Sequence, residues 1–189
     1  MPRGERDTAA LPHKIVLTGF MGTGKSTVGR ILAHRIRFEF IDTDQVIEEM
    51  HGPIPELFER LGEDGFRDIE SALVVELAAR QGVVIATGGG LMLRQENADA
   101  LAADSEVFCL DASVDTILGR VTSGRQLRPL IEASDNPRQT ILTLLAERED
   151  SYAQFTRVST DGLTPSGVAS LLAVKAAMAT QAARRRSES

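Results

Sequence analysis

The sequence predicts an α/β fold of three layers, in which helices cover both faces of a five-stranded parallel sheet. Short apolar runs of strand length alternate along the chain with helical stretches, and this alternation is typical of parallel sheets. The chain has 189 residues, 42% of them hydrophobic, which is enough to build the core of one domain. We find no internal repeat and no low-complexity block, so a single domain is expected.

The expected strands are short apolar runs bounded by polar or turn-forming residues. They cover residues 14–18, 38–41, 83–86, 107–110 and 157–159. Helical periodicity is clearest over residues 69–79, where an apolar stripe consists of Ile69, Leu73, Val74 and Leu77. Further helices are expected directly after Ser26, around Val46 and Ile47, from about Arg138 and over residues 167–178.

The segments outside these elements define the domain boundaries. Residues 1–13 contain two prolines and mixed charges and are expected to form a flexible lead-in, and residues 179–189 to form a flexible tail. The domain itself is expected over residues 14–178. Residues 122–137 are rich in Gly, Ser, Arg, Asp, Asn and Pro and lack sustained periodicity, which predicts a mobile lid.

Composition limits the partners of the protein. Lys and Arg number 21 against 27 Asp and Glu, a net charge of −6 that argues against a general nucleic-acid surface. The arginine run 184–186 is interpreted as solvated charge. No apolar segment approaches the roughly 18 residues of a membrane span, and no signal peptide is recognised. The only cysteine, Cys109, lies in an apolar run and is expected to be a buried thiol, so we expect a soluble cytoplasmic protein.

The segment Gly19-Phe20-Met21-Gly22-Thr23-Gly24-Lys25-Ser26 fits the phosphate-binding pattern G-x-x-x-x-G-K-[ST] and lies between a strand and a helix. Successive backbone N–H groups and the helix dipole would bind phosphate there. Lys25 would reach the β- and γ-phosphates, and Ser26 would ligate Mg²⁺. The nucleotide-binding residues expected from this segment are Gly22, Thr23, Gly24, Lys25, Ser26 and Thr27.

Two carboxylates, Asp42 and Asp44, follow the second expected strand, at the sheet edge where α/β proteins bind ligands. In a phosphate-loop kinase, one such carboxylate can hold the magnesium shell and the other can orient or deprotonate the attacking hydroxyl. The alternative is that Asp44 only caps the following helix.

Arg67 and Glu70 are three residues apart and can meet on one face of a helix. If they face a cleft, Glu70 would orient the Arg67 guanidinium for bidentate binding of a substrate carboxylate. The alternative is a surface ion pair.

The three glycines of Thr87-Gly88-Gly89-Gly90 follow the third expected strand. They form either a tight turn or a loop that a ligand approaches closely, and the number of glycines favours the second.

Two further arginines are candidates. Arg128 lies in the expected lid, where closure would bring a cation to the transferring phosphoryl group and exclude water. Arg148 precedes Tyr152 by four residues on an expected helix. The histidines have no metal-ligand spacing.

These motifs occur in the order found in shikimate kinases, and over residues 14–172 the chain resembles that family, a branch of the phosphate-loop proteins related to nucleoside-monophosphate kinases. The resemblance implies a P-loop NMP-kinase-like fold, ATP-dependent phosphorylation of the 3-hydroxyl of shikimate with Mg²⁺, and a place in the biosynthesis of chorismate and the aromatic amino acids. We expect a monomer whose partners are ATP and shikimate.

The resemblance also assigns roles. It implies that Lys25, Asp44 and Arg128 are catalytic, and that Ser26 and Asp42 support the metal. The residues implied in shikimate binding are Asp44, Arg67, Glu70, Gly89, Gly90 and Arg148. Arg120 and the region of Pro165 are implied to enclose the adenine, although the spacing from Arg120 to Arg128 is about one residue longer than the family pattern and Arg125 is a second candidate cation.

Two alternatives remain at this stage. The first is a related small-molecule kinase with another acceptor, such as gluconate, because the same fold supports several acceptors. The second is a nucleotide-binding regulator without catalytic activity.

Overall fold

The computed structural model describes residues 11–123 and 134–187, and its strands form one parallel sheet in the order β2-β3-β1-β4-β5. The α/β class and the five-stranded parallel sheet are therefore confirmed. The strands are β1 (Lys14–Thr18), β2 (Glu39–Asp42), β3 (Val83–Ala86), β4 (Glu106–Asp111) and β5 (Thr156–Ser159).

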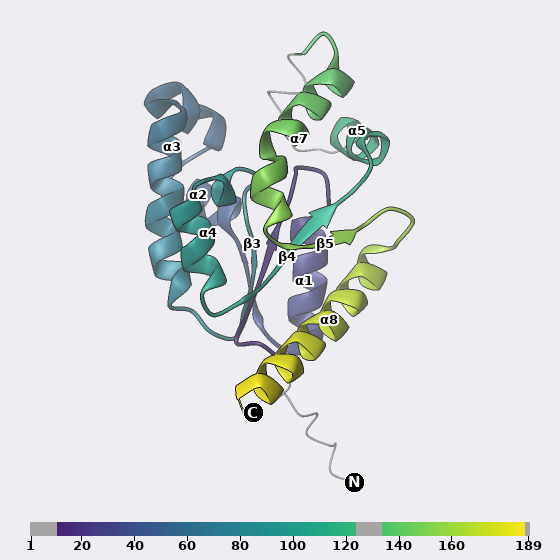
Figure 1. Ribbon diagram of the computed structural model, residues 1–189. Coiled ribbons are helices and arrows are strands. Elements are labelled where there is room, and N and C mark those ends of the chain that lie inside the picture. The colour runs from purple at the N-terminus through teal and green to yellow at the C-terminus, as the bar shows by residue number, and fades with distance from the viewer. Residues whose placement is uncertain (1–10, 124–133, 188–189) are drawn as a thin grey trace.

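All helices but the last connect successive strands as crossover segments, and α8 follows the last strand (Figure 1). They are α1 (Lys25–Ile36), α2 (Thr43–His51), α3 (Ile54–Ala78), the 3₁₀ turn η2 (Leu91–Leu93), α4 (Gln95–Ala102), α5 (Val114–Ser123), α7 (Pro137–Ala153) and α8 (Pro165–Ser187).

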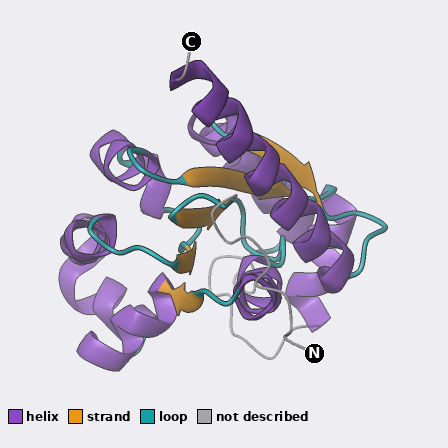
Figure 2. Cartoon of the chain, turned by 90° about the horizontal axis from the view of Figure 1, so that it is seen from below, coloured by secondary structure: helices purple, strands orange, loops and turns teal. Residues whose placement is uncertain are grey.

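Helices lie on both faces of the sheet, as Figures 1 and 2 show. Alternate residues of a strand point to opposite faces. Ile15 and Leu17 of β1 accordingly pack in a core cluster with residues of α1 and α8, whereas Val16 packs in a second cluster with residues of α2, α3 and α4. The three-layer prediction is confirmed.

A third cluster joins the phosphate loop to α5 and α7. Phe20 packs there with Ile117 of α5 and with Ile141 and Tyr152 of α7. Cys109 belongs to the same cluster and is buried, and burial raises the pKa of its thiol to about 11. The thiol is therefore protonated at neutral pH, in agreement with the expected structural role.

Helix α3 begins earlier than the periodicity indicated. It starts at Ile54, after Pro53, and has non-helical dihedral angles at Gly62 (φ 70°, ψ −177°). The kink interrupts the apolar stripe, which explains why only the second half was recognised from the sequence. Arg67 and Glu70 consequently lie within α3 rather than at its start.

The structure describes most of the expected flexible tail, but not most of the expected lead-in and lid. Helix α8 continues to Ser187, so most of the expected flexible tail 179–189 is helical, in a segment rich in alanine, the best helix former. Residues 1–10 of the expected lead-in lie outside the described residues, as do residues 124–133 of the expected lid with Arg128. None of the helices described is both long and apolar enough to cross a bilayer.

The strand order determines which loops meet. Strand β3 pairs with β1 on one side and with β2 on the other. The loop after β3 therefore lies between the loop after β1 and the start of α2, and the direction of winding changes next to β1. Such a switch point is where open α/β sheets bind ligands.

Candidate active site

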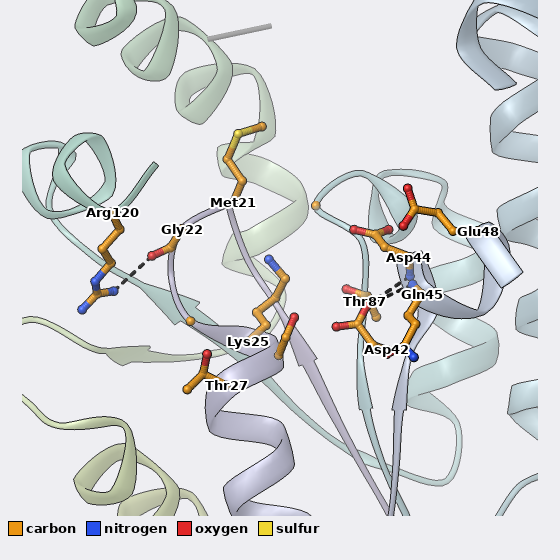
Figure 3. A pocket seen from close by; sticks show the side chains of 13 residues that line it. Met21, Gly22, Lys25, Thr27, Asp42, Asp44, Gln45, Glu48, Thr87 and Arg120 are labelled. Carbon is orange, nitrogen blue, oxygen red and sulfur yellow. Dashed lines mark hydrogen bonds between the residues drawn. The ribbon is translucent and has the colours of Figure 1, made fainter. Parts of the chain in front are cut away.

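A cavity of about 550 Å³ opens at the carboxyl ends of β1, β2 and β3 (Figure 3). One wall is the phosphate loop, the opposite wall is the start of α2, and the loop after β3 joins them. The lining residues are Met21, Gly22, Gly24, Lys25, Ser26, Thr27, Asp42, Asp44, Gln45, Glu48, Thr87, Gly89 and Arg120.

The phosphate loop is held in shape by its own residues. Lys25 Nζ donates to the carbonyl oxygens of Gly19 and Phe20, at 2.8 and 2.9 Å. Thr23 is buried, and its hydroxyl donates to the Phe20 oxygen at 2.7 Å. A Cβ on Gly19 would overlap the carbonyl of Leu110, so the chain can pass β4 here only as glycine. Of the six nucleotide-binding residues predicted from the phosphate-loop segment, all but Thr23 line the cavity within the described chain.

Asp42 and Asp44 both line the wall facing Lys25 (Figure 3). Asp42 is the N-cap of α2, and its Oδ1 accepts from the backbone N–H of Asp44 at 3.2 Å and of Gln45 at 3.5 Å. The capping alternative considered for Asp44 is therefore wrong, because Asp42 fills that role. This places Asp44 in the first turn of α2, with its carboxylate against the glycine loop.

Each glycine of the triplet contacts a different side chain that was predicted to bind the acceptor. A Cβ on Gly88 would overlap Oδ1 of Asp44, and one on Gly90 would lie 2.6 Å from Cζ of Arg67. A Cβ on Gly89 would lie 3.4 Å from Nη1 of Arg148. The chain also turns here, because the N–H of Leu91 donates to the Gly88 oxygen at 3.3 Å. None of the three glycines has a positive φ, however, so the close approach of side chains at Gly88 and Gly90 is what requires glycine.

Arg67 is held by two carboxylates. Its Nη1 donates to Oε2 of Glu70 at 2.6 Å, and its Nη2 donates to Oε1 of Glu63 at 3.0 Å. The side chain of Glu70 is only 1% exposed, and burial raises the pKa of its carboxyl while Arg67 opposes that shift. Because the Arg67–Glu70 pair is buried, the alternative of a surface ion pair is wrong.

Arg148 reaches the same loop from α7. Its Nη1 donates to the carbonyl oxygen of Gly89 at 3.2 Å, and its guanidinium carbon lies 5.4 Å from the centre of the Phe20 ring. The hydroxyl of Tyr152 donates to the same Gly89 oxygen at 2.8 Å. Arg67, Glu70, Gly90 and Arg148 do not line the cavity in the described part of the chain. Arg148 contacts Gly89, which does, whereas Arg67 lies against Gly90 and Glu70 against Gly88.

Of the two predicted adenine contacts, only Arg120 lines the cavity in the described part of the chain. Arg120 lines the cavity, and its Nη1 donates to the Gly22 oxygen at 3.1 Å and to Thr160 Oγ1 at 2.9 Å. It thus joins the phosphate loop to the loop after β5. Pro165 is the first residue of α8 and, among the residues described, is not part of the cavity wall.

The sequence interpretation missed several residues at the site. Met21, Gln45, Glu48 and Thr87 line the cavity. Thr43 is fully buried, and its hydroxyl accepts the N–H of Gly88 at 2.8 Å, so it ties the start of α2 to the glycine loop. Its position between two aspartates was the only local signal, because the partner lies 45 residues away in the sequence.

The oxygen atoms available suit a magnesium ion. Ser26 and Asp42 line the same cavity from opposite walls, and Mg²⁺ prefers hydroxyl, carboxylate and water oxygens. Asp42 Oδ1 is engaged in capping, but a carboxylate has a second oxygen. These two residues fit the small number of protein ligands that Mg²⁺ usually takes beside phosphate.

The fold, the phosphate loop and the cavity beside it together define the chain as a P-loop phosphotransferase. The sequence matches the family described as shikimate kinase over residues 21–176. The shikimate kinase of Thermodesulfovibrio yellowstonii is 44% identical over 158 residues, which cover 82% of this chain and 90% of that protein. The solved structure of the Acinetobacter baumannii shikimate kinase in complex with shikimate is 37% identical, with a TM-score of 0.79 over 86% of this chain and 90% of that one. The chain belongs to the shikimate kinase family.

A likeness to a different kinase shows only the shared fold. A gluconokinase from Sinorhizobium meliloti has a TM-score of 0.64 at 18% identity, over 94% of this chain and 98% of that one. The contrast with the 44% identity to a shikimate kinase favours the shikimate kinase interpretation over the gluconate alternative.

The close approach at Gly90 gives a first prediction. Gly90→Ala should raise the KM for the acidic acceptor about tenfold or more, because the new methyl group displaces the Arg67 guanidinium. The displaced group is the end of a side chain, so the fold should persist, as circular dichroism would check. Gly119→Ala in α5 is the control, since its Cβ would meet nothing within 4 Å. A KM equal to that of the control would show that Arg67 does not depend on Gly90.

Proposed function

We propose that this protein transfers the γ-phosphoryl group of ATP to the 3-hydroxyl of shikimate, giving shikimate 3-phosphate and ADP. The observation that carries the proposal is the glycine loop after β3, whose three residues contact Asp44, Arg148 and Arg67 beside the phosphate loop. One carboxylate and two guanidinium groups suit an acceptor with hydroxyl groups and one carboxylate. The shikimate-bound relative supports this choice of acceptor.

On the donor side, backbone N–H groups of the phosphate loop and the start of α1 bind the phosphates of ATP. Lys25 leaves its contacts with the Gly19 and Phe20 oxygens to pair with the β- and γ-phosphates. Ser26 and Asp42 would hold Mg²⁺, which would neutralise phosphate charge during transfer. Arg120 lies at the Gly22 end of the cavity and is assigned to the adenine side, together with the region of Pro165.

On the acceptor side, Arg67 and Arg148 bind the carboxylate of shikimate. Glu70 orients Arg67 through the 2.6 Å ion pair, and a buried charge pair of this kind has one preferred geometry. Gly89 and Gly90 offer backbone N–H groups to the substrate. These contacts fix the ring so that one hydroxyl faces Asp44.

The chemical step requires a hydroxyl oriented toward the γ-phosphate. Asp44 accepts a hydrogen bond from the 3-hydroxyl and aligns its oxygen. It takes up the proton as the new P–O bond forms and the bond from the γ-phosphorus to the oxygen of the leaving ADP breaks. Lys25, and Arg128 from the segment outside the described residues, balance the charge on the transferring group. The assignment of Arg128 rests on its place in the expected lid and on the family resemblance.

The setting of the reaction is also proposed. We assign the protein to the biosynthesis of chorismate and the aromatic amino acids, in the cytoplasm. A single buried thiol suits a reducing compartment. The protein is expected to act as a monomer, with ATP and shikimate as its partners.

A coupled assay of ADP release tests the function directly. We expect saturable turnover with ATP, Mg²⁺ and shikimate, loss of turnover when Mg²⁺ is chelated, and little turnover with gluconate or nucleoside monophosphates. Comparable rates with gluconate would contradict the acceptor assignment. Tight ATP binding without turnover of any acceptor would instead favour a non-catalytic regulator.

A further inference from the structure

Tyr152 is a buried residue at the acceptor side to which no role has been given. It lies in α7, one helical turn after Arg148, so both side chains project from the same face of the helix. The residue is 4% exposed and packs in the cluster that contains Phe20 and Ile117. Apolar packing explains why the ring is buried, but it does not explain why a polar hydroxyl is buried with it.

The hydroxyl is directed at one backbone atom of the site. It donates to the carbonyl oxygen of Gly89 at 2.8 Å, and Arg148 donates to the same oxygen at 3.2 Å. A carbonyl oxygen has two lone pairs, so it can accept from both donors. Burial raises the pKa of Tyr152, so the phenol remains a protonated donor at neutral pH.

This carbonyl belongs to the Gly89–Gly90 peptide, which both site arginines contact. Gly89 contacts the guanidinium of Arg148, and Gly90 contacts that of Arg67. A trans peptide is planar. A hydrogen bond that fixes the Gly89 oxygen therefore also fixes the direction of the Gly90 N–H and the positions of the α-carbons of Gly89 and Gly90. At the preceding residue, Thr43 accepts the N–H of Gly88. The loop is thus held from α2 on one side and from α7 on the other.

We propose that Tyr152 is a positioning residue for the acceptor site: its hydroxyl fixes the Gly89–Gly90 peptide and thereby the relative placement of Arg148 and Arg67. The inference rests on the proposed function, because it assumes that these two arginines bind the acceptor carboxylate. Tyr152 itself does not touch the substrate in this account.

The test is Tyr152→Phe, which keeps the ring in its cluster and removes only the hydroxyl. We expect the KM for shikimate to rise about threefold to tenfold, as for loss of one hydrogen bond, with the KM for ATP within about twofold of wild type. Thr180→Val is the matched control, since its hydroxyl also donates to a backbone carbonyl, that of Ala176 at 3.1 Å, but lies in α8.

A second substrate separates positioning from general damage. With a shikimate analogue whose carboxylate is replaced by a hydroxymethyl group, the arginines lose their partner, and Tyr152→Phe should then have less than about a twofold effect. An unchanged KM for shikimate, or an equal loss with the analogue or with ATP, would overturn the proposal. If wild-type protein does not turn over shikimate, the proposed function fails instead.

A measurement on the wild-type protein covers the case in which the variant does not fold. Tyr152 is the only tyrosine of the chain, so protein labelled with ¹³C-tyrosine gives one set of ring signals. We expect shikimate to shift these signals with the midpoint of its own binding. Signals that do not respond to saturating shikimate would contradict the coupling between Tyr152 and the acceptor site.

Discussion

Replacing Asp44 with asparagine should lower kcat by about 100- to 10,000-fold, the usual contribution of a general acid or base. Asparagine has the same shape, so the close contact with Gly88 is kept, but it carries no charge and cannot take up a proton. Binding of ATP should change little, because Asp44 lies on the wall opposite the phosphate loop. Steady-state kinetics and a nucleotide titration would measure the two effects.

Asp99→Asn is the matched control for that variant. Asp99 lies in α4 and accepts a hydrogen bond from Gln95 on the surface, so its loss should leave kcat unchanged. If Asp44→Asn lost ATP binding to the same degree as turnover, the assignment of Asp44 to the acceptor hydroxyl would be wrong.

Replacing Arg67 with alanine should raise the KM for shikimate about 10- to 100-fold. A hydrogen bond to a charged group contributes about 1.5–3 kcal/mol, and 1.4 kcal/mol corresponds to a factor of ten. The KM for ATP should stay near its wild-type value, because the bond that is lost belongs to the acceptor. Initial rates over a matrix of both substrate concentrations would separate the two constants.

The removal of Arg67 also leaves Glu70 buried without its cation, so stability must be controlled. Arg67→Lys keeps the charge but loses the bidentate geometry, and we expect a smaller yet clear rise in the same KM. Arg80→Ala is the surface control, because Arg80 pairs with Glu39 and both are half exposed. An unchanged KM for shikimate in a folded Arg67→Ala protein would place Arg67 outside the site.

Local patterns predicted the fold well, because they depend on neighbours in the sequence. The five strands were found to within a residue or so at each end, and the phosphate loop was placed correctly between β1 and α1. Patterns failed where a residue interrupts the periodicity, as Gly62 does in α3. They also failed at residues 179–187, where the alanine-rich end of α8 extends the helix beyond the expected boundary.

Local sequence patterns did not predict which charged side chains are buried. Lys14 was expected in β1 only as part of an apolar run, but it is 1% exposed and its Nζ donates to the carbonyl oxygen of Ala78 at 2.6 Å. The acceptor is the last residue of α3, where carbonyl groups lack helical partners. The contact joins residues 64 apart in the sequence, so no local window contains both.

By itself, the sequence determined the fold class and a phosphate-binding loop in its correct context, because G-x-x-x-x-G-K-[ST] and the alternation of strands and helices act over short distances. It offered Asp44, Arg67, the glycine triplet and Arg148 as separate candidates. Only the tertiary structure decided that they lie side by side. Because β3 pairs between β1 and β2, the glycine loop lies between the phosphate loop and α2. Because glycine has no Cβ atom, Asp44, Arg148 and Arg67 can approach this loop closely.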